Sequence, residues 1–409
     1  MINNGIKEKN FFFYFKIYLL FLAITGLYHL YHKHTGGLDS TISEWMINYK
    51  GGFTRRGLAG EIFIILSNKL DLPIRYIIYI FQSLFYVIFL LLTALFFQKI
   101  RKINYIILLI IYCPLFLIYH VAELEILARK EILIFSHFYI YLIILERNSN
   151  YIFSNIYLFI TFPILALIWE PIVFFIPFYL LCFICKYLKN LKHIDWKLLI
   201  NHFLSYSLLL VVLYFIINQS YSSSNEKLMC NYLKLNLNES CYMSLNYLDT
   251  NIKENFDSLF RDIKFSYIFR YLMVFFIGFL PLYLLLKDSI FYLGGIKLNI
   301  FKIFIILALP ILALYMMGLD WGRWTNISYF YFIISTFFLI LSGNIKINYK
   351  KLNLITKKYF SSRLFLILFF VIFCFGWNTK TLYKGDIASI PGYRVPYFLI
   401  KTFIKNLKQ

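Results

Sequence analysis

The chain alternates between long apolar runs and short polar connections. A run of about 17 to 25 mostly apolar residues is long enough, as a helix, to cross a bilayer core of roughly 30 Å. Eleven runs approach this length, at residues 11–31, 74–97, 104–120, 131–145, 151–169, 171–187, 198–217, 266–286, 298–318, 326–342 and 363–377. Because a backbone in lipid has to satisfy its own hydrogen bonds, these runs predict α-helices. We therefore predict an all-α, polytopic integral membrane protein with about 11 (10–12) transmembrane helices in a single domain, residues 1–409.

Composition and charge agree with this class. Hydrophobic residues make up 61% of the chain and charged residues 15%, whereas soluble domains contain roughly 45–50% and 25%. The net charge of +21 would suit nucleic acid, but Lys and Arg instead fill alternate connections such as "KYLKNLKHIDWK". Of the 20 acidic residues, these connections hold only Glu8, Glu146, Asp195 and Asp288. The positive-inside rule places them in the cytoplasm, so we expect a cytoplasmic N-terminus and no nucleic-acid partner.

The most unusual polar connection is "NYKGGFTRRGLAGE", residues 48–61, on the predicted outer side. Each arginine would cost about 2.5 to 3.5 kcal/mol at the centre of a membrane helix, so Arg55 and Arg56 do not face lipid tails. Glycines allow tight turns here, and "LAGEIFIIL" predicts a short interfacial or re-entrant helix just after the arginines. Arginines beside a helix start suit a phosphate or diphosphate ligand. The alternative is that the pair anchors the loop to lipid headgroups.

Two further outer connections carry charge. "AELEILARKE" places Arg129, Lys130 and Glu131 at the start of a predicted span. Glu125 and Arg129 also have the i, i+4 spacing of an ordinary helix ion pair. "IWEP" places Glu170 in a turn between two spans, where a carboxylate near the membrane is a functional candidate.

A fourth polar stretch, "GLDWGRW", lies between the predicted spans 298–318 and 326–342. Asp320 and Arg323 are three residues apart, and Trp321 and Trp324 stand beside them. Tryptophans are typical of membrane interfaces, but a pair of them beside an acid and a base also suits stacking on a sugar.

Arginines, carboxylates and aromatic rings at one membrane face suit a lipid-linked sugar. The lipid tail would stay among the helices, the diphosphate would meet the arginines, and a carboxylate would deprotonate the acceptor hydroxyl. The candidates for this base are Glu131, Glu170 and Asp320. The candidates for substrate binding are Arg55, Arg56, Arg129, Lys130, Arg323, Trp321 and Trp324. We expect no metal and no other cofactor.

Three patches, "WMINYKGGFTRRGLAGE", "RKE" at 129–131 and "GLDWGRW", resemble the O-antigen and exopolysaccharide polymerases of the Wzy type. The resemblance implies a bacterial inner-membrane enzyme that joins polyprenyl-linked oligosaccharides at the periplasmic face, with outer-loop arginines on the substrate phosphate. It carries this role to Arg55, Arg56 and Arg129. It also implies contacts with membrane lipids and with other polysaccharide-assembly membrane proteins. Many such polymerases have a large arginine-rich outer loop late in the chain. The predicted periplasmic loop 218–265, by contrast, has a single arginine, Arg261.

Two alternatives stay open. A membrane glycosyltransferase resembling the GT-C group would take its sugar from a polyprenyl-phosphate donor and use an acid of the first outer loop, where Asp39, Glu44 and Glu61 are candidates. A flippase or other transporter would also have many spans. Transporters usually place ionisable residues in mid-span and often show an internal repeat, and the sequence displays neither clearly.

Two features outside the candidate site also yield expectations. Cys230 and Cys241 lie in the outer loop, where an oxidising compartment permits a disulfide between them. In the tail, residues 378–409, Lys401, Lys405 and Lys408 fall on one helical face, which predicts an amphipathic interfacial helix. Its lysines favour the cytoplasm, whereas eleven spans would place it outside; an even number of spans would remove this conflict.

Overall fold

The computed structural model describes residues 8–188, 195–219, 221–248, 252–359 and 362–382. Across these residues the protein is an all-α membrane protein, with one small sheet. Seven helical segments are long and apolar enough to cross a membrane: α1 (Glu8–Thr35), α4 (Ile74–Phe97), η2 with α9 (Glu170–Phe175 and Ile176–Tyr187), α10 with α11 (Trp196–Leu204 and Ser207–Ile217), α14 (Phe265–Leu286), α15 (Ile300–Met317) and α16 (Trp321–Leu341). Three shorter helices run among them: α7 (Glu131–Arg147), α8 (Ile152–Ile168) and α18 (Arg363–Phe375).

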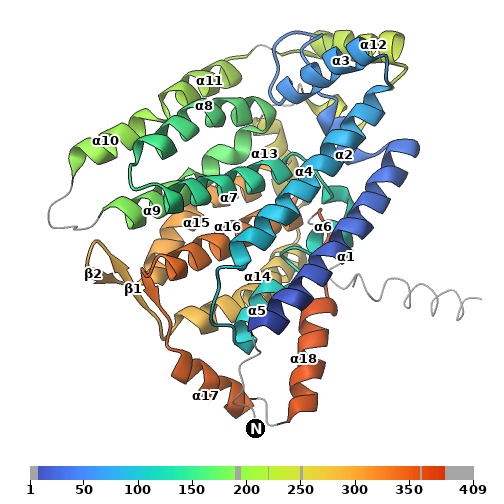
Figure 1. Cartoon of the computed structure of the whole chain (residues 1–409). Helices are drawn as coiled ribbons and strands as arrows, with labels where there is room; N and C mark the ends of the chain where they lie inside the picture. The colour runs from blue at the N-terminus through green and yellow to red at the C-terminus, as the bar shows by residue number, and fades with distance from the viewer. Residues whose placement is uncertain (1–7, 189–194, 220, 249–251, 360–361, 383–409) are drawn as a thin grey trace, which may run out of the picture.

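Helix α16 is the central helix of the bundle (Figure 1). Nearly all of its residues are buried, and it packs against α7, α9, α14 and α15, whereas α1 exposes most of one face. It begins five residues before the apolar run predicted at 326. The prediction left out residues 321–325 because Arg323 would be costly in lipid, but α16 does not meet lipid at this position. The side chains of Arg323 and Asn326 are both buried against polar groups of other segments of the chain.

The prediction of one continuous helix over residues 104–120 is wrong. The chain forms α5 (Tyr105–Ile111), unwinds, and then forms the single turn α6 (Tyr119–Ala122). Side chains of α16 satisfy the exposed carbonyls: Asn326 Nδ2 donates to Leu115 O (2.8 Å), and the Tyr329 hydroxyl donates to Ile110 O (3.0 Å). Irregular backbone at membrane depth is tolerated where protein, not lipid, surrounds it. The apolar composition alone does not reveal this break.

Extramembrane elements gather at the two ends of the bundle (Figure 1). One end carries α2 (Ser40–Trp45), α3 (Leu58–Leu70), α12 (Ser223–Leu237), η3 (Met243–Tyr247) and α13 (Ile252–Asp262). The other end carries α17 (Tyr349–Tyr359) and an antiparallel sheet of order β2-β1-β3, formed by β1 (Ile290–Leu293), β2 (Ile296–Leu298) and β3 (Ile345–Lys346). Helix α3 starts where a helix was predicted, directly after the two arginines. The predicted loop 218–265 contains α12, η3 and α13.

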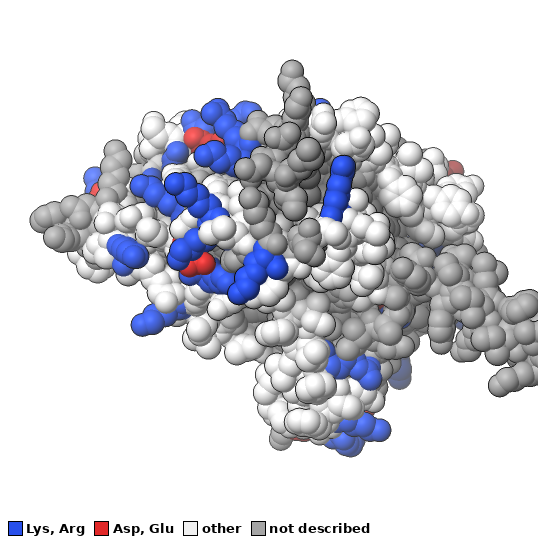
Figure 2. Space-filling view, turned by 90° about the horizontal axis from the view of Figure 1, so that it is seen from below, with Lys and Arg blue, Asp and Glu red and all other residues white. Residues whose placement is uncertain are grey.

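Charge separates these two ends. Seen from below, the face near α17 displays many Lys and Arg side chains and few acids (Figure 2). The sequence of α17, "YKKLNLITKKY", has four lysines and no acidic residue. Residues 378–382 of the predicted tail pack against the start of α16, where Gly322 N donates to Thr381 O (3.0 Å). The rest of the predicted tail helix, with Lys401, Lys405 and Lys408, lies outside the described residues.

Candidate functional site

A buried polar cluster lies at the end of the bundle that carries α2 and α3. Three helical segments begin there: α7 at Glu131, η2 at Glu170 and α16 at Trp321. The free N–H groups at helix starts attract negative charge, which favours carboxylates and anionic ligands at this place. We call this site the arginine–carboxylate cluster; its members are Glu44, Arg56, Arg129, Lys130, Glu131, Glu170, Asp320 and Arg323.

Glu44 is the hub of the cluster. Its side chain is 1% exposed, and it accepts from Arg129 Nε at 2.6 Å and from Arg323 Nη2 at 3.0 Å. Arg56 Nη1 lies 3.8 Å from the same carboxylate. Burial alone would raise the pKa of the Glu44 carboxyl, but the three guanidinium charges outweigh it and hold the pKa well below its usual value. Glu44 is therefore a fixed negative charge that holds three arginines together.

Local structure aims Glu44 inward. The carboxylate of Asp39 caps the start of α2 by accepting from Thr41 N (2.8 Å), which sets the direction of the helix. The next residue, Trp45, is buried and donates from Nε1 to Ala128 O at 3.0 Å. This bond fixes α2 against the turn that carries Arg129.

Arg323 joins the cluster from the first turn of α16. It forms ion pairs with Glu44 and Glu131 inside the cluster, and its Nη1 donates to Asp320 Oδ2 at 3.1 Å. Arg129 Nη1 lies 3.9 Å from the same Asp320 oxygen. Among the ion pairs of the described residues, Arg129 meets Glu44 and Asp320 rather than Glu125, because the chain leaves the helical conformation after Ile126. The i, i+4 pair suggested by spacing is thus replaced by contacts across the fold.

Arg56 and Glu170, 114 residues apart, form the best-aligned pair. Arg56 Nε donates to Glu170 Oε2 and Nη2 donates to Oε1, both at 2.7 Å, which is the two-bond geometry that arginine and carboxylate favour. The Arg56 backbone has φ of 65°, a left-handed conformation that costs a non-glycine residue about 1–3 kcal/mol. Lys130 Nζ donates to the Arg56 carbonyl at 2.8 Å. Arg56 is therefore held at both its side chain and its backbone.

The loop before Arg56 depends on a close helix contact. A Cβ on Gly60 would lie 2.0 Å from the carbonyl oxygen of Ile47, so only glycine at this position lets α3 lie so close to the loop. Arg55 is half-buried beside Arg56. Burial lowers the pKa of Arg55, as does the neighbouring Arg56 charge, while the Glu170 carboxylate acts in the opposite direction. The twin arginines thus enter the site together.

The side chains of the cluster differ in exposure. The buried ones form the floor of the site, and the partly exposed ones form its mouth. The side chains of Glu44, Arg323 and Glu131 are 1%, 4% and 6% exposed, whereas those of Arg56 and Asp320 are 23% and 24% exposed. Glu170 is 18% exposed. A ligand that approaches from outside therefore meets Arg56, Glu170 and Asp320 first. Of the three carboxylates proposed as bases from sequence, Glu131 is the least accessible.

The two tryptophans of "GLDWGRW" are packed inside the protein. Trp321 and Trp324 are 8% and 6% exposed. Trp321 Nε1 donates to Tyr315 O at 2.9 Å, and the Arg323 guanidinium lies 5.3 Å from the centre of a Trp324 ring. Protein covers the ring faces that a sugar would need, so we assign both residues to packing and to support of Arg323.

The other first-loop acids have local partners. Asp39 caps α2 and pairs with Lys33 (3.1 Å). Glu61 pairs with Lys50 (2.6 Å) and accepts from Tyr49 N (3.1 Å), so it closes the loop on itself. Of the three GT-C candidates, the structure brings only Glu44 into the cluster.

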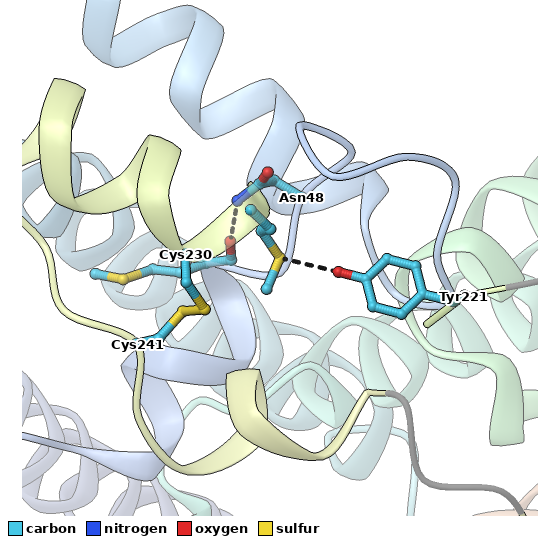
Figure 3. Close-up of a disulfide and its surroundings, with 6 residues drawn as sticks. Asn48, Tyr221, Cys230 and Cys241 are labelled. Atoms are coloured by element: carbon cyan, nitrogen blue, oxygen red, sulfur yellow. Dashed lines mark hydrogen bonds between the residues drawn. A yellow bond between two sulfur atoms is a disulfide. The ribbon is translucent and has the colours of Figure 1, made fainter. Parts of the chain in front are cut away.

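A covalent cross-link stabilises the segment above the arginine loop. Cys230 and Cys241 form the disulfide that was expected between them in the outer loop, and this prediction is confirmed. Figure 3 shows it beside Asn48 of the loop and Tyr221 at the approach to α12. Asn48 is buried and donates from Nδ2 to Met46 O (2.9 Å), while its own oxygen accepts from Lys50 N (2.9 Å).

Helix α12 rests directly on the loop. Asn225 Nδ2 donates to Gly51 O at 2.6 Å, and a Cβ on Gly51 would lie 2.0 Å from the Asn225 carbonyl oxygen. Within the loop that the disulfide closes, Glu239 accepts from Arg75 Nε at the start of α4 (2.6 Å). The segment 222–248 is therefore a cover anchored on two sides, and it holds the loop that carries Arg55 and Arg56.

Sequence reasoning missed a polar layer next to the cluster. Lys380 Nζ lies 3.3 Å from Glu123 Oε2, and both residues adjoin the start of α16. A Cβ on Gly322 would lie 1.9 Å from the Lys380 carbonyl oxygen and 2.6 Å from the Tyr119 hydroxyl. The sequence signal for this layer was Gly322 in "GLDWGRW". Only glycine at this position allows another backbone to approach so closely beside Arg323.

Lys130 is the cation most affected by burial. Its side chain is fully buried just before α7, and the ammonium lies 5.9 Å from the centre of a Trp45 ring. Burial lowers the pKa of Lys130 to about 7, although the nearby Glu44 carboxylate opposes the shift. The residue thus changes charge near neutral pH inside the cluster.

This shift predicts a pH dependence of stability. Between about pH 7 and the ordinary lysine value of 10.5, the unfolded chain keeps a proton that folded Lys130 has lost, so the free energy of unfolding rises with pH. Below about pH 7 both the folded and the unfolded state hold the proton, so this gain in the free energy of unfolding is absent. Thermal unfolding of the wild type and of Lys130→Met, measured from pH 7 to 9.5, is expected to show the wild type gaining relative to the variant. A constant difference between the two proteins would contradict the shift.

No protein-family model, curated protein or solved structure matches this chain. The chemistry of the cluster therefore has to come from its own residues. With Arg55, it brings five basic and four acidic side chains to three helix starts. Such a site can hold an anionic group at Arg56 and present a carboxylate to a neighbouring hydroxyl.

Proposed function

We propose that the protein is a polymerase-type glycosyltransferase that acts on polyprenyl-diphosphate-linked oligosaccharide units. The reaction would take place at the periplasmic face of the bacterial inner membrane, in the synthesis of O-antigen, capsule or exopolysaccharide. The observation that carries this proposal is the meeting of Arg56, Glu170, Asp320 and Arg323 at one end of an apolar bundle. A substrate with a lipid tail, a diphosphate and a sugar needs this combination of surroundings.

The arginines supply the phosphate chemistry. Arg56 lies at the accessible mouth beside Arg55, where a diphosphate can exchange for part of the Glu170 pairing. Two negatively charged phosphates gain bidentate hydrogen bonds there. As the glycosidic bond to the diphosphate breaks, negative charge grows on the leaving oxygen, and the fixed guanidinium groups stabilise it.

Asp320 is the best-placed base. It occupies the capping position of α16, yet its side chain makes no capping hydrogen bond and faces Arg323 and Arg129 instead. Its exposure of 24% leaves it open to an acceptor hydroxyl. Glu131 is buried in the floor, and Glu170 is committed to two hydrogen bonds with Arg56.

Orientation follows from the charge difference between the ends. The basic face of Figure 2 would lie in the cytoplasm, with the start of α1 beside it, and the cluster in the periplasm. We propose eleven crossings: the seven long segments, α7, α8 and α18, and the broken passage through α5 and α6. The disulfide between Cys230 and Cys241 then lies in an oxidising compartment.

The position of Glu44 favours one second candidate. A transferase of the GT-C type would use an acid from the first outer loop, and Glu44 is the first-loop acid within the cluster. Its enclosure by three arginines makes proton transfer to it unfavourable. The identity of the donor separates the two functions: polyprenyl-phosphate sugar for the GT-C type, and polyprenyl-diphosphate oligosaccharide for the polymerase.

Replacement of the twin arginines tests the proposal. In a strain that depends on this protein for its surface glycan, Arg56→Ala, alone or with Arg55→Ala, is expected to abolish long glycan chains, because the diphosphate loses its bidentate partner. Glycan length is read from a gel, and membrane levels from an immunoblot. Lys50→Ala serves as the control, since Lys50 lies in the same loop but pairs with Glu61. Long chains at normal protein level in Arg56→Ala would refute the assignment.

A further inference from the structure

A large apolar groove runs along α1, between this helix, α5 and α18. Its volume is about 850 Å³, and aromatic rings dominate its lining, among them Phe21 of α1, Tyr112 after α5 and Phe370 of α18. The rims at Tyr14 and Phe21 are 64% and 59% exposed, whereas Phe11 at the lower end is buried. The groove therefore opens sideways, toward the place where lipid surrounds the bundle.

The length of the groove matches a membrane. The residues of α1 that line it recur every three or four positions, from Phe11 through Tyr18 and Thr25 to His29. This spacing places them on one helical face. The eighteen residue-to-residue steps from Phe11 to His29, at about 1.5 Å each, give a length of roughly 27 Å, close to the thickness of the hydrocarbon core. A single extended hydrocarbon chain can lie along the whole face.

The groove leads to the candidate site. Its lining becomes polar at the outer end, at Thr25 and His29, and there it also includes Val121. Two residues after Val121, Glu123 pairs with Lys380. Lys380 and Thr381 contact Gly322, which stands between Asp320 and Arg323. The outer end of the groove is thus connected through one polar layer to the arginine–carboxylate cluster.

We propose that this groove is the binding site for the polyprenyl chain of the lipid-linked substrate, which enters sideways from the bilayer between α1 and α18. The inference rests on the proposed function and adds the place where the tail lies. The rigid aromatic walls provide flat contacts for a methyl-branched chain along its length. Continuity with the cluster selects a lipid whose head is a diphosphate over a bulk phospholipid.

Photolabelling of the full chain in nanodiscs tests the site. The probe is a polyprenyl diphosphate that carries a diazirine in its tail, and labelled peptides are mapped by mass spectrometry. Labels are expected on α1 and α18, and excess unlabelled polyprenyl diphosphate should remove them while phosphatidylglycerol does not. Thr25→Trp fills the groove and is expected to reduce this labelling at least tenfold. Ile24→Trp, on the same turn but outside the groove lining and 61% exposed, should leave it unchanged.

Photolabelling and the Arg56→Ala variant test the groove and the proposed function separately. Labels confined to other helices, or removed equally well by phosphatidylglycerol, overturn the groove. If Arg56→Ala still abolishes long chains in that case, the proposed function stands without it. If the probe labels no part of the protein and Arg56→Ala leaves chain length normal, both proposals fail.

Discussion

Glu44→Ala is expected to destabilise the protein by about 3–5 kcal/mol, the range for removal of one partner from a buried ion pair. The variant leaves Arg129 and Arg323 facing each other without the carboxylate that lies 2.6 and 3.0 Å from them. These side chains are only 9% and 4% exposed, so bulk solvent compensates little for the lost partner. The expected loss is far larger than that for a surface ion pair, which contributes roughly 0–1 kcal/mol.

Thermal unfolding in detergent measures this effect, with Glu61→Ala as the matched control. Glu61 is also a first-loop glutamate with a basic partner, Lys50, but its pair is more exposed. Glu44→Gln keeps the shape and one acceptor oxygen, and it should lie between the wild type and the alanine variant. The double variant Glu44→Ala with Arg129→Ala should recover part of the stability, because one stranded charge is removed. Unfolding of Glu44→Ala at the wild-type temperature would show that the arginines do not depend on this hub.

The membrane class and many helix positions follow from sequence because lipid imposes a simple rule. Apolar length predicted residues 74–97 as a span, and α4 has these bounds, with Pro73 before its first residue. The rule fails where protein replaces lipid as the surroundings. The predicted span 104–120 breaks after Ile111 because Asn326 can satisfy a carbonyl of the unwound stretch, and α16 begins early because Arg323 finds buried carboxylates. These partners lie about 200 residues away in sequence, beyond the reach of a local pattern.

For the candidate site too, the sequence indicated some features and missed others. The glycines and paired charges of "NYKGGFTRRGLAGE" and "GLDWGRW" indicated that these stretches do not face lipid, and the structure brings Arg56 and Arg323 into one cluster. Sequence did not reveal the pairing of Arg56 with Glu170 or the central place of Glu44. Both depend on which helix starts meet in space. The interfacial tryptophan pattern was also ambiguous, since the rings of Trp321 and Trp324 are covered by protein.

Asp320→Asn is expected to lower the rate of glycan transfer by about 10²–10⁴-fold, the usual contribution of a general base. The amide keeps the shape of the side chain but cannot accept the proton of an acceptor hydroxyl. Because the arginines at the mouth remain, binding of the lipid-linked substrate should change little, so kcat falls while KM stays near its wild-type value. Arg56→Ala should raise KM, because Arg56 would hold the diphosphate before the reaction. It should also lower kcat in part, because Arg56 would hold the diphosphate during the reaction as well.

Steady-state kinetics with purified lipid-linked oligosaccharide distinguish these two signatures. Asp39→Asn is the matched control, because Asp39 caps α2 at the same end of the bundle and asparagine caps a helix equally well. Glu170→Gln weakens the pair with Arg56 and should act mainly on KM. A normal kcat in Asp320→Asn would exclude Asp320 as the base. If Glu170→Gln then lost kcat instead, the proton acceptor would be the carboxylate on the other side of Arg56, and the acceptor sugar would approach the mouth from η2 rather than from α16.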